Sequence, residues 1–493
     1  IDLGFTSLKY PTTEKFLAFE KVEHADIDTL MEVETIDESD TAATVVVVED
    51  TMEVINNAKG NVNVQLIING VTEHVEDDGL IRRIEYGEGQ KQLLWPFFEK
   101  LERIKSDRSR VRIVHYGDSQ IEGDRMTAYI RQRLQSMFGG TGPGFTPLKP
   151  IYNQITVDIE HSENWNRYAV FDGLSKGKVE GAEYGLWMQS SRFTLPLPDS
   201  LVTDTIEPTK AWVNLGSSKI TYANARTFNQ IKLHYTNCFT RCTIKVLNNG
   251  EVLVQDTLIP DGNYHVYTLN VAETPSDMRF EFESTCSPDF LGFSLDAPYG
   301  VSVDNVAMRG SSGTIFNRIN YALFDRMADD LGVELYIMQF GGNGLAAIKN
   351  EEGATNYANW LKSQIATVKR TRPNAQIIFL GPSDMSTLIE GERVTYPLME
   401  YQVDEFKRIC FESGVAYWDI YRAMGGKNSM STWVENDLAA PDYIHFSNGG
   451  AKLITEILVK ALLLEYQDYK AGKSGGGNPT EEQPQEPQPD EAQ

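Results

Sequence analysis

The chain has 493 residues, of which 41% are hydrophobic and 10% aromatic, so it can bury a large core and should hold two or three domains. Its formal net charge of -25 argues against binding to nucleic acid or to an anionic membrane surface through bulk electrostatics. No apolar run approaches the ~18 residues that a membrane-spanning helix requires.

The N-terminal 90 residues are acidic and show little regular pattern. The chain begins at Ile1 without an initiator methionine, so we expect that a signal or membrane-anchor segment has been removed. Val45–Val48 and Val62–Ile68 have the composition of short strands, and we interpret residues 1–90 as a stalk or small appendage. Leu93–Ile104 then predicts an amphipathic helix that leads into the core.

The stretch Val111–Phe138 predicts a strand followed by a helix. Val111–Tyr116 is a short apolar run that contains β-branched residues, and apolar residues then recur at helical spacing up to a plausible C-cap at Gly139-Gly140. Gly117-Asp118-Ser119 forms the turn between them, which in an open α/β sheet lies at the carboxyl edge, where ligands bind. We therefore expect Ser119 above a helix N-terminus as a nucleophile. Taken alone, the tripeptide is more typical of a capped turn.

From about residue 150 to 300 the hydrophobic period changes to two, which is typical of strands. Ile231, Leu233 and Tyr235 would share one face of such a strand, and Asn248-Asn249-Gly250 is a hairpin signal. Several short strands with turns between them predict a β-sandwich. Because helical and parallel-strand patterns resume on its far side, residues 151–300 should form an inserted domain.

The four cysteines contain no C-x-x-C pair, so the sequence suggests neither a zinc site nor a thioredoxin-like motif. Cys238, Cys242 and Cys286 fall within the insert, and Cys410 lies beyond it. The sequence is equally consistent with a disulfide among the first three and with buried free thiols. Three tryptophans also lie in or just before the β-rich segment: Trp165, Trp187 and Trp212. Tryptophan can stack on sugar rings, but for each of the three a place in the core is the stronger expectation.

Four short apolar runs after the insert predict further strands, with helical patterns between them: Ser302–Ala307, Val333–Gln339, Gln376–Leu380 and Val415–Trp418. Strand and helix in alternation predict a parallel sheet covered on both faces. Residues 91–150 and 301–470 should therefore form one α/β domain, a three-layer α/β/α, doubly wound, flavodoxin-like fold with five parallel strands. Residues 471–493 are rich in Gly, Pro and Glu and should be disordered.

The ends of these strands carry candidate catalytic groups. Gly310 follows the second strand and Asn343 the third, so both should lie with Ser119 along one edge of the sheet. A backbone N–H from glycine and a carboxamide N–H from asparagine are what an oxyanion hole needs. Either residue alone is more typical of a turn or a helix cap.

A candidate base lies near the end of the chain, in Asp442-x-x-His445. The chain has seven histidines, and Asp158-x-x-His161 in the insert shows the same spacing, so the spacing by itself is weak. His445, however, lies in the loop after the fifth strand, on the edge where Ser119 is expected. A serine needs an adjacent base to act as a nucleophile, and that base needs a carboxylate to hold its tautomer.

Four blocks taken in order resemble those of the SGNH, or GDSL-type, hydrolase family: Gly117-Asp118-Ser119, Gly310, Gly341-Gly342-Asn343 and Asp442-x-x-His445. The resemblance covers roughly Leu93–Tyr469 apart from the insert. One departure is Gly344, which stands where the family often has an aspartate after the asparagine. A G-x-S-x-G pattern, typical of α/β-hydrolases, is absent because Ile121 occupies the second glycine position.

The resemblance implies roles for these residues. Ser119 would be the nucleophile, His445 the general base and then acid, and Asp442 the residue that orients the imidazole. The oxyanion donors would be the Ser119 N–H, the Gly310 N–H and the Asn343 side chain. No metal or cofactor is needed for this chemistry.

A β-sandwich inserted between the first two blocks is similar to the arrangement of bacterial peptidoglycan O-acetylesterases. The resemblance implies a serine esterase that removes O-acetyl groups from peptidoglycan or another polysaccharide, in the periplasm or at the bacterial cell envelope. Two alternatives remain open: a polysaccharide O-acetyltransferase with the same residues, and a non-catalytic carbohydrate-binding protein on the same fold. We expect the insert to help hold a polymeric substrate.

Overall fold

A computed structural model of the chain describes most of residues 82–474 and three strands before them: 52–56, 62–68, 71–77, 82–152, 155–172, 179–195 and 207–474. The three N-terminal strands form an antiparallel sheet of their own: β1 (Met52–Asn56), β2 (Val62–Ile68) and β3 (Val71–Asp77). The strand predicted at Val62–Ile68 is thus confirmed. The strand expected at Val45–Val48 lies outside the described residues. Of the tail predicted over residues 471–493, residues 471–474 instead continue the last helix, and the rest lies outside the described residues.

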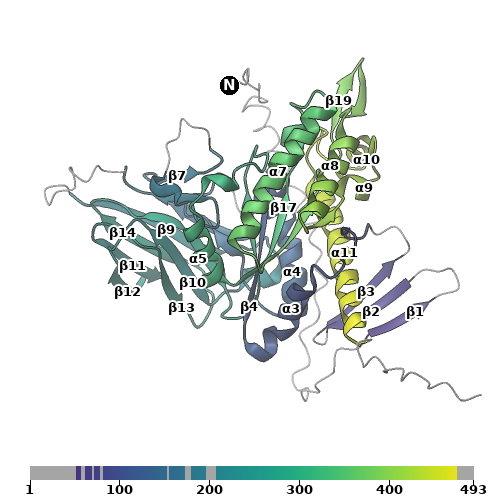
Figure 1. Cartoon of the computed structure of the whole chain (residues 1–493). Helices are drawn as coiled ribbons and strands as arrows, with labels where there is room; N and C mark the ends of the chain where they lie inside the picture. Colours follow the sequence, from purple (N-terminus) through teal and green to yellow (C-terminus); the bar gives the residue numbers. More distant parts are fainter. Residues whose placement is uncertain are drawn as a thin grey trace, which may run out of the picture. The chain divides into compact units, whose positions relative to one another are not determined.

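A five-stranded parallel sheet forms the centre of the molecule (Figure 1). In spatial order its strands are β16 (Gly300–Ala307), β4 (Arg110–Gly117), β17 (Val333–Gln339), β18 (Gln376–Leu380) and β21 (Ala416–Trp418). In chain order this is 2-1-3-4-5, the flavodoxin-like order that the sequence predicted. The chain therefore passes from β4 to one neighbour, β16, and later adds β17 on the other side of β4. In sheets of this kind, ligands bind at the carboxyl end of the strand where the order reverses.

Helices cover both faces of this sheet, so the predicted three-layer α/β/α architecture is confirmed. One face carries α3 (Trp95–Asp107), α4 (Thr127–Phe138) and α11 (Asn448–Ser474). The other carries α5 (Tyr321–Leu331), α7 (Glu351–Thr371) and α8 (Met399–Glu412). Shorter elements fill the connections: α6 (Gly342–Leu345), α9 (Ile420–Ala423), α10 (Ser429–Glu435) and the hairpin of β19 (Ser386–Ile389) and β20 (Glu392–Thr395).

The insert is a sandwich of two antiparallel sheets, as the sequence predicted. One sheet contains β13 (His265–Asn270), β10 (Gln230–Thr236), β15 (Asp289–Asp296), β8 (Gln189–Arg192) and β7 (Asn166–Ala169), with β5 (Gly144–Thr146) beside β15. The other contains β12 (Glu251–Thr257), β11 (Cys242–Asn248), β14 (Met278–Ser284), β9 (Thr209–Ser217) and β6 (Val157–His161). The predicted hairpin joins β11 to β12, where Asn249 and Gly250 have the positive φ angles of such a turn.

Aromatic side chains of the insert lie mainly in cores. Trp165 packs between the two sheets against Phe193, Phe282 and Phe290, and Trp187 stacks on Phe145 with ring centroids 4.4 Å apart. Both tryptophans are fully buried, so neither is available to a sugar ring. The preference for a core position is confirmed for these two.

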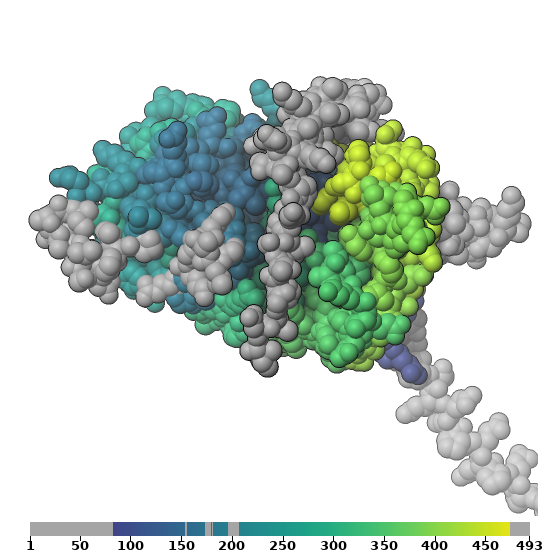
Figure 2. Space-filling view, turned by 90° about the horizontal axis from the view of Figure 1, so that it is seen from above, coloured from purple at the N-terminus to yellow at the C-terminus, as the bar shows by residue number. Residues whose placement is uncertain are grey.

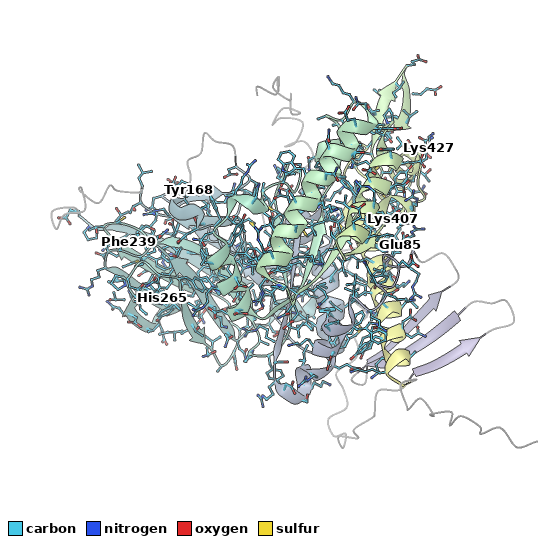
Figure 3. All side chains as sticks on the ribbon, in the orientation of Figure 1. Glu85, Tyr168, Phe239, His265, Lys407 and Lys427 are labelled. Carbon is cyan, nitrogen blue, oxygen red and sulfur yellow. The ribbon has the colours of Figure 1, made fainter. Side chains whose placement is uncertain are left out.

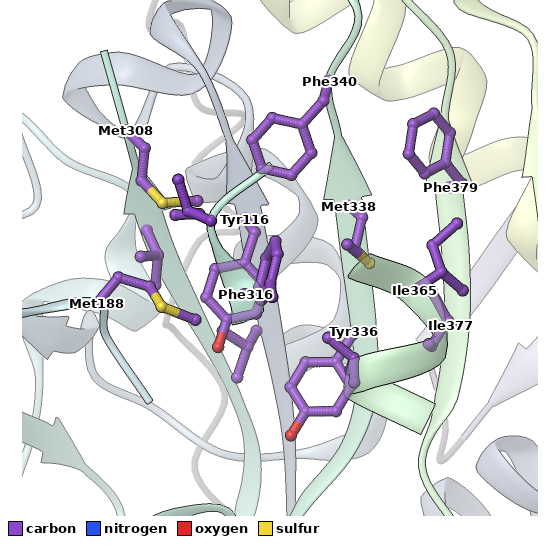
Figure 4. Close-up of a cluster of buried hydrophobic side chains, with 14 of the residues drawn as sticks. Tyr116, Met188, Met308, Phe316, Tyr336, Met338, Phe340, Ile365, Ile377 and Phe379 are labelled. Carbon is purple, nitrogen blue, oxygen red and sulfur yellow. The ribbon is translucent and has the colours of Figure 1, made fainter. Parts of the chain in front are cut away.

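The insert and the α/β domain share a hydrophobic core. Figure 4 shows part of it: Met188 of the insert lies in the same cluster as Tyr116 of β4 and Tyr336 of β17. The rings of Tyr116 and Tyr336 stack with centroids 6.0 Å apart, and the Tyr116 hydroxyl donates to the carbonyl of Leu186 at 2.6 Å. Apolar burial of this kind is the main stabilising term in folding, so the two parts stabilise each other.

A buried ion-pair network strengthens the same junction. Arg112 of β4 is fully buried and pairs with Asp296 of β15 and with Asp304 of β16. Asp304 also accepts a hydrogen bond from Trp187 Nε1 at 2.8 Å and from the Phe145 N–H at 3.0 Å. Because every charge has a partner of opposite sign, the cost of removing these groups from water is offset only while the network is complete.

The outer edge of β21 is covered by the segment that precedes α3. Glu85 pairs with Tyr417 as an isolated antiparallel bridge, through N–H to carbonyl bonds of 2.8 and 2.9 Å. Trp418 Nε1 donates to the carbonyl of Arg82 at 2.8 Å, and Lys407 of α8 forms an ion pair with Glu85 (Figure 3). This cover removes an open edge that could pair with another chain.

All four cysteines are free thiols, which settles the alternative that the sequence left open. Burial raises the pKa of Cys238 to about 12, so this thiol is unreactive at neutral pH. Among the described residues, no three His, Cys, Asp or Glu side chains gather into a metal-binding group. None of the described helices combines the length and apolarity needed to cross a membrane.

Replacing Arg112 by leucine should lower the free energy of unfolding by roughly 3–5 kcal/mol, because it leaves two buried carboxyl groups without their cation. Urea unfolding measures the change. Arg326→Leu is the control, since Arg326 pairs with Asp330 on the surface of α5 and such pairs contribute about 0–1 kcal/mol. Equal effects of the two substitutions would contradict the role given to Arg112.

Candidate active site

Ser119 lies at the carboxyl end of β4, as predicted, but not at the start of an α-helix. It is the first residue of η2 (Ser119–Asp124), a 3-10 helix that Asp118 caps by accepting the Gln120 N–H at 3.0 Å. Gly123, with φ 68°, interrupts this segment, and α4 begins only at Thr127. The expectation of an α-helix N-terminus directly beneath Ser119 was therefore wrong, because the seven residues Gln120–Met126 separate Ser119 from the first residue of α4.

The structure brings together the three residues proposed as a catalytic triad. Ser119 Oγ lies 2.7 Å from His445 Nε2, and His445 Nδ1 lies 2.7 Å from Asp442 Oδ2. Both distances are those of good hydrogen bonds. Asp158-x-x-His161, the other match to this spacing, lies on β6 of the insert, where His161 Nδ1 is 2.9 Å from the carbonyl of Ser162.

Asp442 is held in place by its own turn. Its Oδ1 accepts the backbone N–H groups of Ile444 at 2.9 Å and His445 at 3.0 Å, while Oδ2 faces the imidazole. Removal from water opposes ionisation of Asp442, but the hydrogen bond and charge of His445 and the two N–H groups outweigh it and lower the pKa of the carboxyl. An ionised Asp442 requires the proton on Nδ1, which leaves Nε2 free to accept the Ser119 proton.

The two other strand ends meet Ser119 at the same edge. Asn343 of α6 donates from Nδ2 to Asp118 Oδ2 at 3.0 Å and to the carbonyl of Ser311 at 3.2 Å. It thereby links the turn of the nucleophile to the loop that contains Gly310. Within the part of the chain that the structure describes, neither the Ser119 N–H nor the Gly310 N–H donates a hydrogen bond. These two donors are available to an incoming oxyanion.

Comparison with known proteins gives a match to the fold. A solved structure of a peptidoglycan O-acetylesterase matches with a TM-score of 0.57, at 19% sequence identity, over 76% of this chain and 96% of that chain. The chain has the SGNH/GDSL-type esterase fold. At this identity the likeness concerns the fold alone. No family model matches the sequence, and no curated protein matches it either.

Two further solved structures are similar to parts of this chain. A family two carbohydrate esterase from Clostridium thermocellum matches at 13% identity over 53% of this chain and 94% of that chain, with a TM-score of 0.24. An esterase from Pseudoalteromonas sp. matches at 13% identity over 33% of this chain and 78% of that chain, with a TM-score of 0.25.

Gly344, the departure from the SGNH pattern, has a structural explanation. A Cβ atom at this position would lie 2.3 Å from the Tyr357 ring, so any larger residue would displace that ring. The Tyr357 hydroxyl in turn donates to the carbonyl of Ser312 at 2.8 Å. The ring of Tyr357 therefore lies against the position where the family often has an aspartate, and it supports the loop after Gly310.

Gln120 supports the site, and the sequence reasoning missed it. Its Nε2 donates to Ser383 Oγ at 3.0 Å and to the carbonyl of Ile444 at 2.7 Å, and its Oε1 accepts the Phe446 N–H at 3.2 Å. The side chain thus holds the backbone on both sides of His445. Its position directly after Ser119 was the only signal in the sequence, because its partners lie more than 260 residues away.

Glu122 and Arg309 form a second link that the sequence did not reveal. Arg309 Nε donates to Glu122 Oε1 at 2.7 Å, and the Glu122 side chain is only 7% exposed. Glu122 belongs to the 3-10 helix of the nucleophile, and Arg309 immediately precedes Gly310. The pair therefore connects the nucleophile to one of the proposed oxyanion donors.

Asn343→Ala should lower kcat on a small aryl acetate, because it removes a proposed oxyanion donor, a loss that typically costs ~10²–10³-fold. Both N–H groups of the amide are engaged in this structure, so one must turn from Ser311 or Asp118 to the oxyanion, and we expect the lower end of that range. Asn374→Ala, at an exposed position two residues before β18, is the control. If kcat of folded Asn343→Ala is unchanged, Asn343 is not an oxyanion donor and only connects Asp118 to Ser311.

Gln120→Leu should lower kcat roughly 10–100-fold with little change in KM, because a small displacement of the base from Ser119 slows proton transfer without removing a substrate contact. Steady-state kinetics on the same aryl acetate measures both constants. Gln92→Leu, at an exposed position before α3, is the matched control. If kcat of folded Gln120→Leu equals that of the control, Gln120 does not position His445.

Proposed function

We propose that the protein is a serine esterase that removes O-acetyl groups from peptidoglycan or another cell-wall or extracellular polysaccharide. One observation carries the proposal: Ser119, His445 and Asp442, from two turns far apart in the chain, form a continuous pair of 2.7 Å hydrogen bonds. This is the arrangement that converts a weakly nucleophilic hydroxyl into an attacking group. An assembled triad also argues against a purely carbohydrate-binding protein.

The geometry supports a two-step acyl transfer. As Ser119 Oγ attacks the acetyl carbonyl carbon, His445 Nε2 takes the hydroxyl proton, and the ionised Asp442 stabilises the imidazolium that forms. The proton then passes from Nε2 to the sugar oxygen, so the C–O bond breaks and the sugar hydroxyl leaves. Water repeats the sequence on the acetyl-serine, giving acetate and free Ser119. The route uses no metal or cofactor.

The negative oxygen of each tetrahedral intermediate needs donors aimed at it. The unpaired N–H groups of Ser119 and Gly310 come from adjacent loops at the same sheet edge and would supply two of them. The Asn343 amide would supply the third after releasing one of its present partners. Backbone donors of this kind require little rearrangement as the charge develops.

The proposal also names a class of substrate, an acetylated polysaccharide. It is supported by the match to a peptidoglycan O-acetylesterase, which covers 76% of this chain and so extends beyond the α/β domain alone. The His445 side chain is 25% exposed and that of Asp442 is 45% exposed, so water reaches the site. This favours hydrolysis over transfer to a second sugar, the alternative with the same residues. Such a substrate implies action at the bacterial cell envelope.

Ser119→Ala should abolish hydrolysis of p-nitrophenyl acetate and release of acetate from an acetylated glycan, because the acyl acceptor is removed. The measurement is acetate released over time, with circular dichroism to establish that the variant is folded. Ser136→Ala, an exposed serine of α4, is the control and should retain full activity. Substantial turnover by folded Ser119→Ala would refute the proposed nucleophile.

A further inference from the structure

A layer of buried polar side chains lies beneath the turn that carries Ser119. Three of them come from neighbouring strands of the parallel sheet: His115 of β4, Asn305 of β16 and Gln339 of β17. The fourth, Thr127, is the first residue of α4. All four side chains are at most 7% exposed. Polar groups are costly to bury unless they are hydrogen-bonded, and the chemistry proposed above uses none of these four.

The sheet brings the three strand residues to one face. His115 and Asn305 are register partners, and Gln339 is the register partner of Gly117, two residues after His115. Residues two apart on a strand point to the same face, which here is the face that α4 covers. β16 is also the first strand after the insert, whose blue and teal surface lies beside the green and yellow second half of the α/β domain in Figure 2.

The hydrogen bonds of this layer run in one direction. Gln339 Oε1 can only accept, so the ring proton of a neutral His115 lies on Nε2, 3.1 Å away. His115 Nδ1 must then accept the proton of the Thr127 hydroxyl, at 2.9 Å. Thr127 Oγ1 in turn accepts from Asn305 Nδ2 at 3.0 Å, and the same Nδ2 donates to the carbonyl of Ile121 at 2.7 Å.

This arrangement requires a neutral imidazole. A second ring proton would make Nδ1 a donor, and the Thr127 hydroxyl would lose its acceptor. Burial is the main reason that the pKa of His115 is lowered to about 4; the hydrogen bond with Gln339 opposes this shift, and the charge of Arg131 adds to it. Arg131 is itself paired with Asp124 of η2. His115 is therefore a neutral hydrogen-bonding group at neutral pH.

The turn above this layer has little regular structure to hold it. η2 is a 3-10 helix, and Gly123 and Asp124 both have φ angles of 68°, so the backbone bends sharply before α4 begins. A left-handed φ costs free energy at a non-glycine residue such as Asp124, so side-chain contacts must hold the turn. Asn305 holds it at the carbonyl of Ile121, two residues after Ser119.

We propose that a chain of three positioning residues, His115, Thr127 and Asn305, holds the nucleophile in its reactive orientation. His115 orients the Thr127 hydroxyl, which orients the Asn305 amide. The amide holds the Ile121 carbonyl, so Ser119 Oγ and the Ser119 N–H keep their places beside the substrate carbonyl. None of the three positioning residues touches the reacting atoms, so their loss should lower kcat rather than raise KM. This inference rests on the proposed esterase function.

Thr127 gives a direct test, because valine has the same shape without the hydroxyl and serine keeps the hydroxyl. Thr127→Val should lower kcat on p-nitrophenyl acetate roughly 10-fold with little change in KM, because a small displacement of the nucleophile slows attack. Thr127→Ser should retain most of kcat. Thr455→Val is the matched control and should leave kcat unchanged, because Thr455 is fully buried on α11 and donates to the carbonyl of Ala451 in its own helix.

A double variant tests whether the residues act in series. Asn305→Leu removes the donor to Ile121 and should lower kcat at least as much as Thr127→Val. Because Thr127 acts only through Asn305, the double variant Thr127→Val/Asn305→Leu should lower kcat no further than Asn305→Leu alone. Urea unfolding identifies the variants that fold. If Thr127→Val does not fold, Asn305→Leu tests the same chain at the hydrogen bond that reaches the turn.

The outcomes separate this inference from the proposed function. If the unaltered protein does not hydrolyse p-nitrophenyl acetate, the esterase function fails. If it does, but folded Thr127→Val or folded Asn305→Leu keeps its kcat, the positioning chain is overturned. It is also overturned if the two losses multiply in the double variant, if Thr455→Val loses as much kcat as Thr127→Val, or if the loss appears in KM instead of kcat.

Discussion

The hydrogen bond between Ser119 and His445 joins two turns that are 326 residues apart in the chain, and the proposed chemistry depends on keeping them 2.7 Å apart. The parallel sheet brings both turns to one edge, but a shared edge does not define a hydrogen bond. Gln120 supplies the missing restraint, because it follows the nucleophile directly and holds the backbone beside His445. The two halves of the site are therefore positioned by a side chain that does none of the chemistry.

The same principle applies to the proposed oxyanion donors. Asp118 and Asn343 connect the turn of Ser119 to the loop after β16, and Glu122 with Arg309 connects them a second time. Burial raises the pKa of Asp118, although the Gln120 N–H, the charge of His445 and the Asn343 amide favour its ionised form. A buried polar network of this kind is stable only when every member has its partner, so the geometry of the site is specified as a unit.

The insert is integrated into the α/β domain rather than attached to it. Arg112, on the second strand of the parallel sheet, has one carboxylate partner in the insert and one in β16, and Met188 joins a core that also holds Tyr116. A junction held in this way keeps residues of the insert at a constant distance from Ser119.

The sequence by itself determined the fold class, the insert as a β-sandwich and the residues that meet in the triad, because hydrophobic period and strand-to-loop order are local properties. It did not show that seven residues separate Ser119 from α4, because a 3-10 turn with a glycine kink has no regular hydrophobic period. Only the tertiary structure decided the contacts of Gln120, Arg309 and Tyr357. Their partners lie far along the chain, and hydrogen bonds between distant residues depend on packing that no local pattern encodes.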